Sequence, residues 1–312
     1  MAWINTAIKS HFSQNRHHVT NPQNKAAAMA YIKTYMEDTL HLDVYFDVFP
    51  TLVSSVYGRN IIGVLKGQKY GTADDILYGI GAHYDTMRDT AGVDDNGSGV
   101  IIMLDAATSL AKNKNRKYTC FFVAFDFEEW EYRSQASNVA CDESTGIGCG
   151  SKHFVYDWIP NFIANHHSAA PTFGGVYVMD TIMNFNDGDG VQTLPHGFSL
   201  PFPKQYESIQ SDGFDGDFVA AIGRRDDHTL QDLFQKSWSP KVFPAAEVEG
   251  LSLPITGVPT VQEESLFGDF FRSDHLHFWR HNMSAIFLTD TGDDVVLMIC
   301  TMISVVLGLR TM

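Results

Sequence analysis

The chain has 312 residues, of which 44% are hydrophobic, so it can bury a large core in one large domain or two small ones. Its 22 basic and 37 acidic residues give a formal net charge of -15, and no basic patch stands out. This charge argues against nucleic acid or an anionic membrane surface as a partner.

Hydrophobic periodicity predicts that helices and strands alternate along the chain. A helix is expected to begin near Pro22, because four apolar residues then share one face: Met29, Ile32, Met36 and Leu40. Further helices are predicted at residues 97–111, 151–158 and 229–234. Strands are predicted at residues 44–48, 60–65, 76–82, 118–125, 176–179 and 285–288.

This alternation predicts the α/β class, as a three-layer sandwich in which helices flank a central mixed, mostly parallel sheet. Ligands bind such sheets beyond the carboxyl ends of the strands. We expect residues 1–312 to form a single domain. The apolar run at residues 295–309 is shorter than the roughly 20 residues of a membrane span, so we expect a buried terminal helix and no membrane span.

Polar residues follow three of the predicted strands. These residues are His83 and Asp85 after the first strand, Glu128 and Glu129 after the second, and Asp180 after the third. Asp95 lies in a glycine-flanked loop between the first two groups. Two neighbouring divalent ions need imidazole nitrogens, several carboxylates to offset their charge, and a further carboxylate that takes a proton from water. The order of these groups along the chain therefore predicts a metal site.

The same residues resemble the co-catalytic zinc exopeptidases of peptidase family M28, the bacterial-type aminopeptidases. The resemblance rests on His-Tyr-Asp at residues 83–85, Asp-Asp-Asn-Gly-Ser-Gly at 94–99, the Glu pair at 128–129, and Asp180. Residues 59–67, 150–153 and 273–279 fit the same pattern. The similarity extends from about Asn21 to Asp290, which is most of the chain.

The resemblance implies a set of metal ligands. His83 and Asp180 would hold one zinc ion. Asp95 would bridge this ion to a second zinc ion, which Glu129 would also ligate. A cis peptide bond is expected between Asp95 and Asn96, as is frequent in the family.

The resemblance also implies two catalytic roles. Asp85 would orient the ring of His83 by accepting the hydrogen of its second nitrogen. Glu128 would act as the general base that deprotonates the attacking water and as the acid that protonates the leaving amine.

The sequence departs from the family pattern near its end. Family members carry a further zinc-ligating histidine after the last predicted strand, whereas no histidine follows His281 here. We therefore expect a short segment to be missing between about residues 290 and 293, through a skipped exon, a faulty gene model or divergence to an inactive protein. Replacement by another histidine is the remaining explanation, with four candidates: His166, His167, His275 and His277.

The expected function is that of a zinc-dependent exopeptidase that acts on peptides or small dipeptides. Among exopeptidases, an aminopeptidase is the favoured interpretation. The family binds two zinc ions, but only Asp95 and Glu129 remain for the second, so we expect one firmly bound ion and impaired activity. Two alternatives stay open: a single-zinc acyltransferase similar to glutaminyl cyclases, and an inactive binding protein that keeps the fold. The sequence leaves the oligomeric state open.

The remaining motifs bear on location and on other ions. Cys141 and Cys149 bracket a glycine-rich loop that a disulfide would close, and with the family resemblance this favours a secreted protein or an endomembrane lumen. No signal peptide is visible at the start of the sequence, which opposes that location. Residues 186–190 (Asn-Asp-Gly-Asp-Gly) hint at a calcium loop without the downstream glutamate of an EF-hand, so a surface turn is the simpler interpretation.

Overall fold

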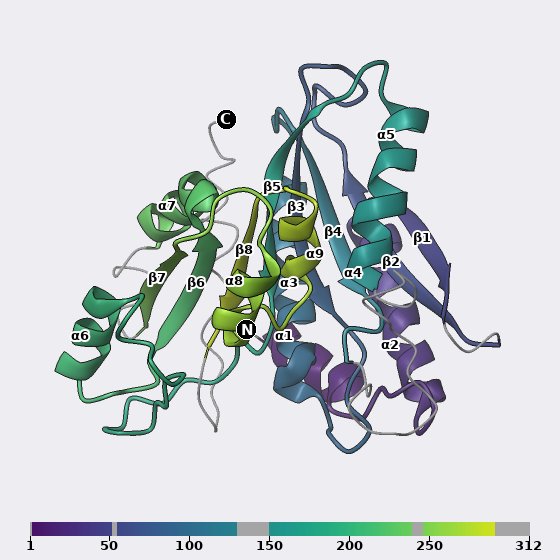
Figure 1. Cartoon of the computed structure of the whole chain (residues 1–312). Coiled ribbons are helices and arrows are strands. Elements are labelled where there is room, and N and C mark those ends of the chain that lie inside the picture. The colour runs from purple at the N-terminus through teal and green to yellow at the C-terminus, as the bar shows by residue number, and fades with distance from the viewer. Residues whose placement is uncertain (1, 52–54, 130–149, 239–245, 291–312) are drawn as a thin grey trace.

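The computed structural model describes residues 2–51, 55–129, 150–238 and 246–290, which form one mixed sheet with helices on both of its faces (Figure 1). The strands are β1 (Asp43–Pro50), β2 (Tyr57–Leu65), β3 (Ile76–His83), β4 (Thr119–Phe125), β5 (Thr172–Met179), β6 (Phe218–Arg224), β7 (Glu247–Leu253) and β8 (Ala285–Thr289). They lie in the order β1-β2-β4-β3-β5-β8-β6-β7.

Four of the seven strand pairings are parallel, which confirms the mixed, mostly parallel sheet. The parallel pairings are β3 with β4, β3 with β5, β5 with β8, and β6 with β7. The direction of the sheet changes between β8 and β6, which pair antiparallel. The central block β4-β3-β5-β8 therefore runs one way, and its strands end at one common edge.

Each face of the sheet buries its own apolar layer, because successive strand residues point to opposite sides. Ile61 and Ile80 pack into one layer, whereas Ile62 and Leu77 pack into the other. The first layer is covered by α1 (Ala2–Ala7), η1 (Ile8–Phe12), α2 (Pro22–Thr34), η2 (Tyr35–Thr39), α3 (Gly99–Lys112) and α7 (His228–Ser237).

The second layer is covered by α4 (Gly150–His153), η4 (Phe154–Trp158), α5 (Ile159–His166), α6 (Pro203–Ser211), η6 (Gly268–Phe270) and α9 (His275–Arg280). The short helix α8 (Val261–Leu266) precedes η6, and the turns η3 (Val93–Ser98) and η5 (Arg225–Asp227) complete the elements of the described residues. Helices on both faces confirm the predicted three-layer sandwich. Among the described residues, no helix combines the length and the apolarity that crossing a membrane would need.

The strands and helices predicted within the described residues are present with shifted ends. The strands β6 and β7 and the helices α1, α5, α6, α8 and α9 were not predicted. β6 and β7 lie in a part of the chain for which the sequence analysis placed only the helix now seen as α7. Cys120 is a buried free thiol, and burial raises its pKa to about 12. The terminal helix expected at residues 295–309 and the pairing of Cys141 with Cys149 lie outside the described residues.

Close packing at the ends of β3 and β4 positions the predicted metal site. His83 is the last residue of β3 and pairs in register with Phe125, the last residue of β4. A side-chain carbon at Gly81 would lie 2.4 Å from the ring of Phe125, so only glycine lets this ring pack against the strand. The segments after β3, β4 and β5 consequently leave the sheet side by side.

We predict that Ile286 in β8 contributes strongly to the stability of the sheet. Its side chain is fully buried in the layer that contains Tyr177, at the strand that joins the two halves of the sheet. Substitution Ile286→Val should lower the free energy of unfolding by about 0.5–1.5 kcal/mol, and Ile286→Ala by about 2–5 kcal/mol, because the deletion leaves a cavity. Urea denaturation measures both. Equal stability of the two variants would contradict this packing.

Candidate metal centre

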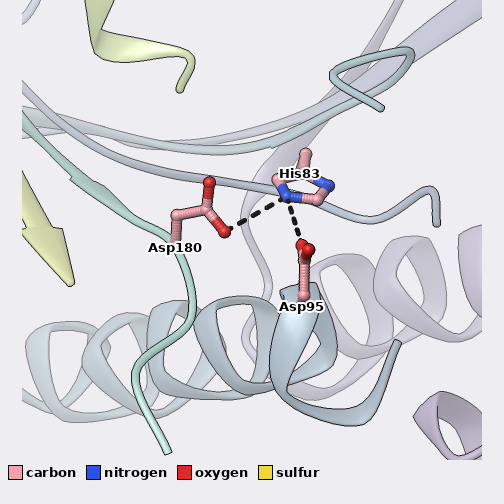
Figure 2. Close-up of side chains that lie close together, drawn as sticks. All are labelled: His83, Asp95 and Asp180. Carbon is pink, nitrogen blue, oxygen red and sulfur yellow. Dashed lines mark hydrogen bonds and ion pairs between the residues drawn. The ribbon is translucent and has the colours of Figure 1, made fainter. Parts of the chain in front are cut away.

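Three side chains from three different segments converge at the carboxyl edge of the sheet (Figure 2). Nε2 of His83 lies 3.1 Å from Oδ1 of Asp95 and 3.3 Å from Oδ1 of Asp180. One ligand atom from each residue lies within 4.8 Å of the other two. The His83 ring is fully buried, whereas the side chain of Asp95 is 47% exposed, so the group opens to solvent on the Asp95 side.

The spacing of these atoms fits a single zinc ion. Ligand atoms of a tetrahedral zinc site, each about 2.0–2.2 Å from the metal, lie about 3.4 Å from one another. The two distances from His83 Nε2, 3.1 and 3.3 Å, are close to this value. The donor set of one imidazole and two carboxylates is also one that zinc takes in catalytic sites.

The turn that carries Asp95 is held by its neighbours. The peptide bond between Asp95 and Asn96 is cis, as the family resemblance led us to expect. The Asn96 amide donates to the carbonyl oxygen of Met179 at 2.7 Å, and its side-chain oxygen accepts the backbone N–H of Gly99 at 3.0 Å. The end of β5 and the start of α3 thus fix the turn on both sides.

Asp94 connects the same turn to the segment after β5. Its Oδ1 accepts the backbone N–H of Met183 at 2.9 Å, and its Oδ2 accepts the side-chain amide of Asn184 at 2.6 Å. The backbone N–H of Asn184 donates in turn to Oδ2 of Asp290 at 2.7 Å. Burial raises the pKa of Asp290 to about 9. Asp94 therefore holds the turn that carries Asp95 in place, because its own carboxylate is bound to the segment after β5.

Asp85 lies next to the His83 ring, but Nδ1 of His83 has no hydrogen-bond partner among the described residues, so the predicted hydrogen bond to Asp85 is not formed. Its Oδ1 is 3.5 Å from Nδ1 of His83, on the ring side opposite Asp95. Its two oxygens also accept the backbone N–H groups of Glu128 at 3.3 Å and Glu129 at 3.2 Å. Burial alone would raise the pKa of Asp85, but the partner His83 lowers it to about 2. The ionised carboxylate thus links the ends of β3 and β4.

The two glutamates after β4 both lie close to the group. Oε2 of Glu128 is 3.9 Å from Nε2 of His83. Oε1 of Glu129 accepts the backbone N–H of Met87 at 3.3 Å. Burial, followed by the charge of Asp95, raises the pKa of Glu129 to about 9. Glu129 is therefore near Asp95, on the side where a second ion was predicted.

Negative charge exceeds positive charge at this centre. Burial opposes protonation of His83, yet the charges of Asp180 and Glu128 raise its pKa well above the usual range. Burial likewise raises the pKa of Glu128 well above its usual range. One imidazole does not neutralise four surrounding carboxylates, and a bound dication would supply the missing positive charge.

The four histidines proposed as replacement ligands are not part of this group. His167 contacts Asp75 through Nε2 at 3.3 Å, just before the opposite end of β3. His166 precedes it and packs against Tyr45. Nε2 of His275 lies 2.9 Å from the carbonyl oxygen of Phe270. Among the described residues, the group that could hold a metal contains His83 as its single histidine.

His275 and His277 both lie in α9. The ring of His275 stacks on Phe287, and burial lowers its pKa to about 3. His277 is also buried, and burial lowers its pKa well below the usual range. Both rings are therefore neutral components of the core beneath the sheet.

Two residues that the sequence analysis did not assign to the centre also act on it. Asp274 is fully buried next to Ser151, and burial raises its pKa to about 7, with His83 acting in the opposite direction. Its position in the Ser-Asp-His stretch at 273–275 was the available signal. Arg16 is also fully buried and donates from Nε to the carbonyl oxygen of Tyr84 at 2.8 Å. Arg16 lies outside every motif, so no sequence pattern indicated its role.

Arg16 joins the N-terminal segment to the loop between His83 and Asp95. Besides Tyr84, its guanidinium donates to the carbonyl oxygens of Gly92 at 2.7 Å and Phe12 at 2.9 Å. Its backbone N–H donates to the hydroxyl of Thr86 at 2.9 Å. Burial lowers the pKa of Arg16 to about 10, so the side chain stays charged at neutral pH.

The sequence profile of peptidase family M28 matches residues 60–238, which is more than half of the chain, and the chain belongs to this family. Among curated proteins, it is 25% identical over 234 residues to the uncharacterized protein YfbL of Escherichia coli (strain K12). That alignment covers 72% of this chain and 58% of YfbL, so the chain spans a little over half the length of this relative.

Solved structures share the fold at low sequence identity. A glutaminyl cyclase from Macrostomum lignano has a TM-score of 0.61 at 13% identity, with 100% of this chain and 88% of that chain covered. A Zn-dependent exopeptidase from Parabacteroides distasonis has a TM-score of 0.51 at 14% identity, with 94% and 84% covered. The zinc exopeptidase-like architecture is therefore shared with a cyclase and a peptidase alike.

We predict that Arg16→Met loosens the metal centre without reaching any ligand directly. The variant removes the side-chain donor to the buried carbonyl oxygen of Tyr84. It also removes one of the two donors to the carbonyl oxygen of Gly92, which still accepts the N–H of Gly97. The loss of these charge-assisted hydrogen bonds should lower the free energy of unfolding by about 3 kcal/mol. Arg116 also donates to backbone carbonyls but is half-buried, so Arg116→Met should have a smaller effect. Denaturant unfolding of both variants, with zinc content measured in parallel, checks this. Equal losses would contradict the role of Arg16.

Proposed function

We propose that this chain is a zinc-dependent exopeptidase of the aminopeptidase type, which hydrolyses the N-terminal bond of a peptide or small dipeptide. The observation that carries the proposal is the position of His83 Nε2, 3.1 Å from Asp95, 3.3 Å from Asp180 and 3.9 Å from Glu128. An imidazole, two ligand carboxylates and one further carboxylate are the groups that metal-assisted hydrolysis uses. Membership of peptidase family M28 supports the same reaction class.

The metal would be held by His83, Asp95 and Asp180. Asp95 is the most exposed of the three and also neighbours Glu129, so these two carboxylates would face a second ion. When bound, zinc supplies Lewis acidity, which lowers the pKa of water and polarises a peptide carbonyl. Asp85 keeps Nε2 of His83 directed at the ligand group by facing Nδ1 from behind.

Glu128 is the residue that moves the proton in this proposal. Its carboxylate lies beside the ligand group, and its side chain is 14% exposed, so solvent and substrate reach it from one side only. Burial raises its pKa, which makes the carboxylate a stronger base than an exposed glutamate. Glu128 accepts a proton from the attacking water at a carboxylate oxygen. It then donates that proton to the nitrogen of the leaving amine.

The charge of the centre favours substrates that carry a free amino group. The carboxylates of Asp95, Glu128, Glu129 and Asp180 surround a single imidazole. Zinc bound at the centre would keep these four carboxylates ionised, and their four negative charges would exceed the two positive charges of the ion. The remaining negative charge would attract a cationic α-amino group. An aminopeptidase substrate places such a group next to the bond that is broken, which supports the amino end as the point of attack.

A glutaminyl-cyclase-like acyltransferase is the second candidate. The TM-score of 0.61 with a glutaminyl cyclase and the single complete ligand group both favour it. Such a reaction would also start from a free α-amino group, so charge does not separate the two candidates. The Asp-Asn-Gly-Ser-Gly turn at residues 95–99 supports the peptidase, through the family resemblance stated above. An inactive protein that keeps the fold is the outcome in which neither reaction is found.

We predict that Glu128→Gln lowers hydrolysis of aminoacyl amides by about 10²–10⁴-fold while zinc stays bound, because the amide keeps the shape but not the basicity of the carboxylate. Steady-state kinetics and zinc analysis on the same samples measure the two effects. Glu207→Gln, on the exposed side of α6, should behave like the parent chain.

Three results would count against the proposal. Unchanged activity of Glu128→Gln would contradict the assignment of the base. A parent chain that holds zinc but shows no hydrolysis would favour the inactive protein. Cyclisation of N-terminal glutamine without hydrolysis would favour the acyltransferase.

We also predict that the purified chain retains one equivalent of zinc after dialysis against a mild chelator. The group of His83, Asp95 and Asp180 offers three ligands, whereas Asp95 and Glu129 offer only two to a second ion. His83→Ala should remove the retained equivalent, and Glu129→Gln should leave it in place. Elemental analysis by mass spectrometry measures the ratio. Two equivalents that survive dialysis would contradict the expected weak second site.

A further inference from the structure

A second group of acidic residues lies apart from the metal centre, between β5 and β6. Two segments, residues 186–192 and 212–217, run side by side there. Asn186 and Gly216 exchange two backbone hydrogen bonds, at 2.9 and 2.7 Å. The N–H of Gly190 donates to the carbonyl oxygen of Gly213 at 2.8 Å, and that of Gln192 to Phe214 at 2.9 Å. These bonds hold the two segments in a defined register.

The two segments bring five carboxylates together, which we call the acidic cluster: Asp187, Asp189, Asp212, Asp215 and Asp217. In three of them, Asp212, Asp215 and Asp217, the Oδ1 atom is buried and has no hydrogen-bond partner within the described residues. Buried acceptors of this kind are almost always satisfied in folded proteins. The cluster therefore has unused oxygen ligands that face away from solvent.

A neutral side-chain oxygen lies next to the backbone of the acidic cluster, at Gly216. Gln192 is only 5% exposed, and its Nε2 donates to the carbonyl oxygen of Thr193 at 2.7 Å. This bond leaves Oε1 of Gln192 buried and without a partner in the described part of the chain. A side-chain carbon at Gly216 would lie 3.5 Å from this oxygen. The Oε1 atom thus faces the backbone between Asp215 and Asp217.

The glycine at position 213 leaves room between two of the carboxylates. A side-chain carbon at Gly213 would lie 2.9 Å from Oδ1 of Asp189 and 3.4 Å from Oδ1 of Asp215. Both oxygens therefore flank the same point, which any larger residue would fill. The φ angle of 90° at Gly213 also favours glycine.

Within the described part of the chain, the charged groups that act on Asp215 and Asp217 are all negative. The charged groups that act on Asp215 are Asp189, Asp212 and Asp187, and after burial they raise its pKa. Burial, followed by the charge of Glu247, raises the pKa of Asp217 to about 6. Mutual repulsion of this kind is relieved when a cation binds, because the ion attracts every carboxylate at once.

We propose that the acidic cluster and Gln192 form a calcium site. The available ligands are all oxygens, without the imidazole or thiolate that zinc prefers. Calcium accepts six to eight oxygen ligands in a flexible geometry, whereas magnesium demands a near-ideal octahedron. Among the described residues, only the group at His83 already has three ligand atoms within 4.8 Å of one another, so calcium would draw the carboxylates of the cluster inward. Asp187 and Asp189 are exposed on a glycine-containing loop and have the freedom to turn.

The position of the acidic cluster gives the ion a structural role. The segment from Thr181 to Gln192 begins directly after the metal ligand Asp180. Within it, Met183 and Asn184 hold Asp94, the residue before the ligand Asp95. Calcium at the cluster would fix the far end of this segment. Calcium binding at the acidic cluster does not require that the chain hydrolyses peptides.

The test is equilibrium dialysis of the zinc-loaded full chain against radioactive calcium in a tenfold excess of magnesium. We expect one saturable equivalent of calcium per chain. The double variant Asp189→Asn, Asp215→Asn should weaken binding by at least about tenfold, because it removes two charged ligands. Its thermal stability without calcium should match or exceed that of the parent, because repulsion is reduced. A control double variant, Asp38→Asn, Asp74→Asn, makes an equal charge change at two exposed positions and should leave calcium affinity within about twofold of the parent.

One more variant distinguishes calcium binding at the acidic cluster from zinc binding at the His83 centre. His83→Ala should lose zinc and still bind calcium with unchanged stoichiometry. The proposal is overturned if the parent shows no saturable calcium binding. It is also overturned if the control variant Asp38→Asn, Asp74→Asn weakens binding as much as Asp189→Asn, Asp215→Asn, or if His83→Ala abolishes calcium binding.

Discussion

The buried imidazole of His83 is the interaction on which the centre depends. It ends the central strand β3, contacts Asp95 and Asp180 through one nitrogen, and faces Asp85 through the other. The parallel arrangement of β3, β4 and β5 makes this meeting a property of the sheet, because the segments that follow these strands all emerge at one edge. The same arrangement brings together more negative charge than the surrounding protein groups neutralise.

Many of the other polar side chains around the centre form hydrogen bonds with main-chain groups and not with the side chains of His83, Asp95 or Asp180. Arg16 binds the carbonyl groups on both sides of the loop after β3, and Asp94 binds the segment after β5. Asn96 ties the turn with the cis bond to the end of β5. These contacts connect parts of the chain that are far apart in sequence. They fix the main chain that carries His83, Asp95 and Asp180, and leave these three side chains free to face one another.

The sequence was sufficient to predict the sheet core and the convergence of His83, Asp95 and Asp180, for a physical reason. The central strands are almost wholly apolar, so a histidine or carboxylate directly after them is conspicuous, and parallel strands bring such residues together. β7 was missed because glutamates at 247 and 249 alternate with apolar residues in an edge strand, and β6 because small residues weaken its pattern. Arg16 and Asp274 were missed because burial of a polar side chain depends on tertiary contacts that no local pattern reveals. The register of the segments around Gln192 was hidden for the same reason.

The position of Asp85 has a consequence for how variants of this chain are interpreted. One carboxylate receives the main-chain hydrogens of Glu128 and Glu129 while it faces the ring of His83. Loss of its charge would release the stretch after β4 and the imidazole in a single event. In the proposed mechanism, a kinetic defect at position 85 would therefore combine misplacement of Glu128, the proposed proton carrier, with loosening of His83, a proposed metal ligand. An inherited or engineered change there would mimic damage at residues that remain chemically intact.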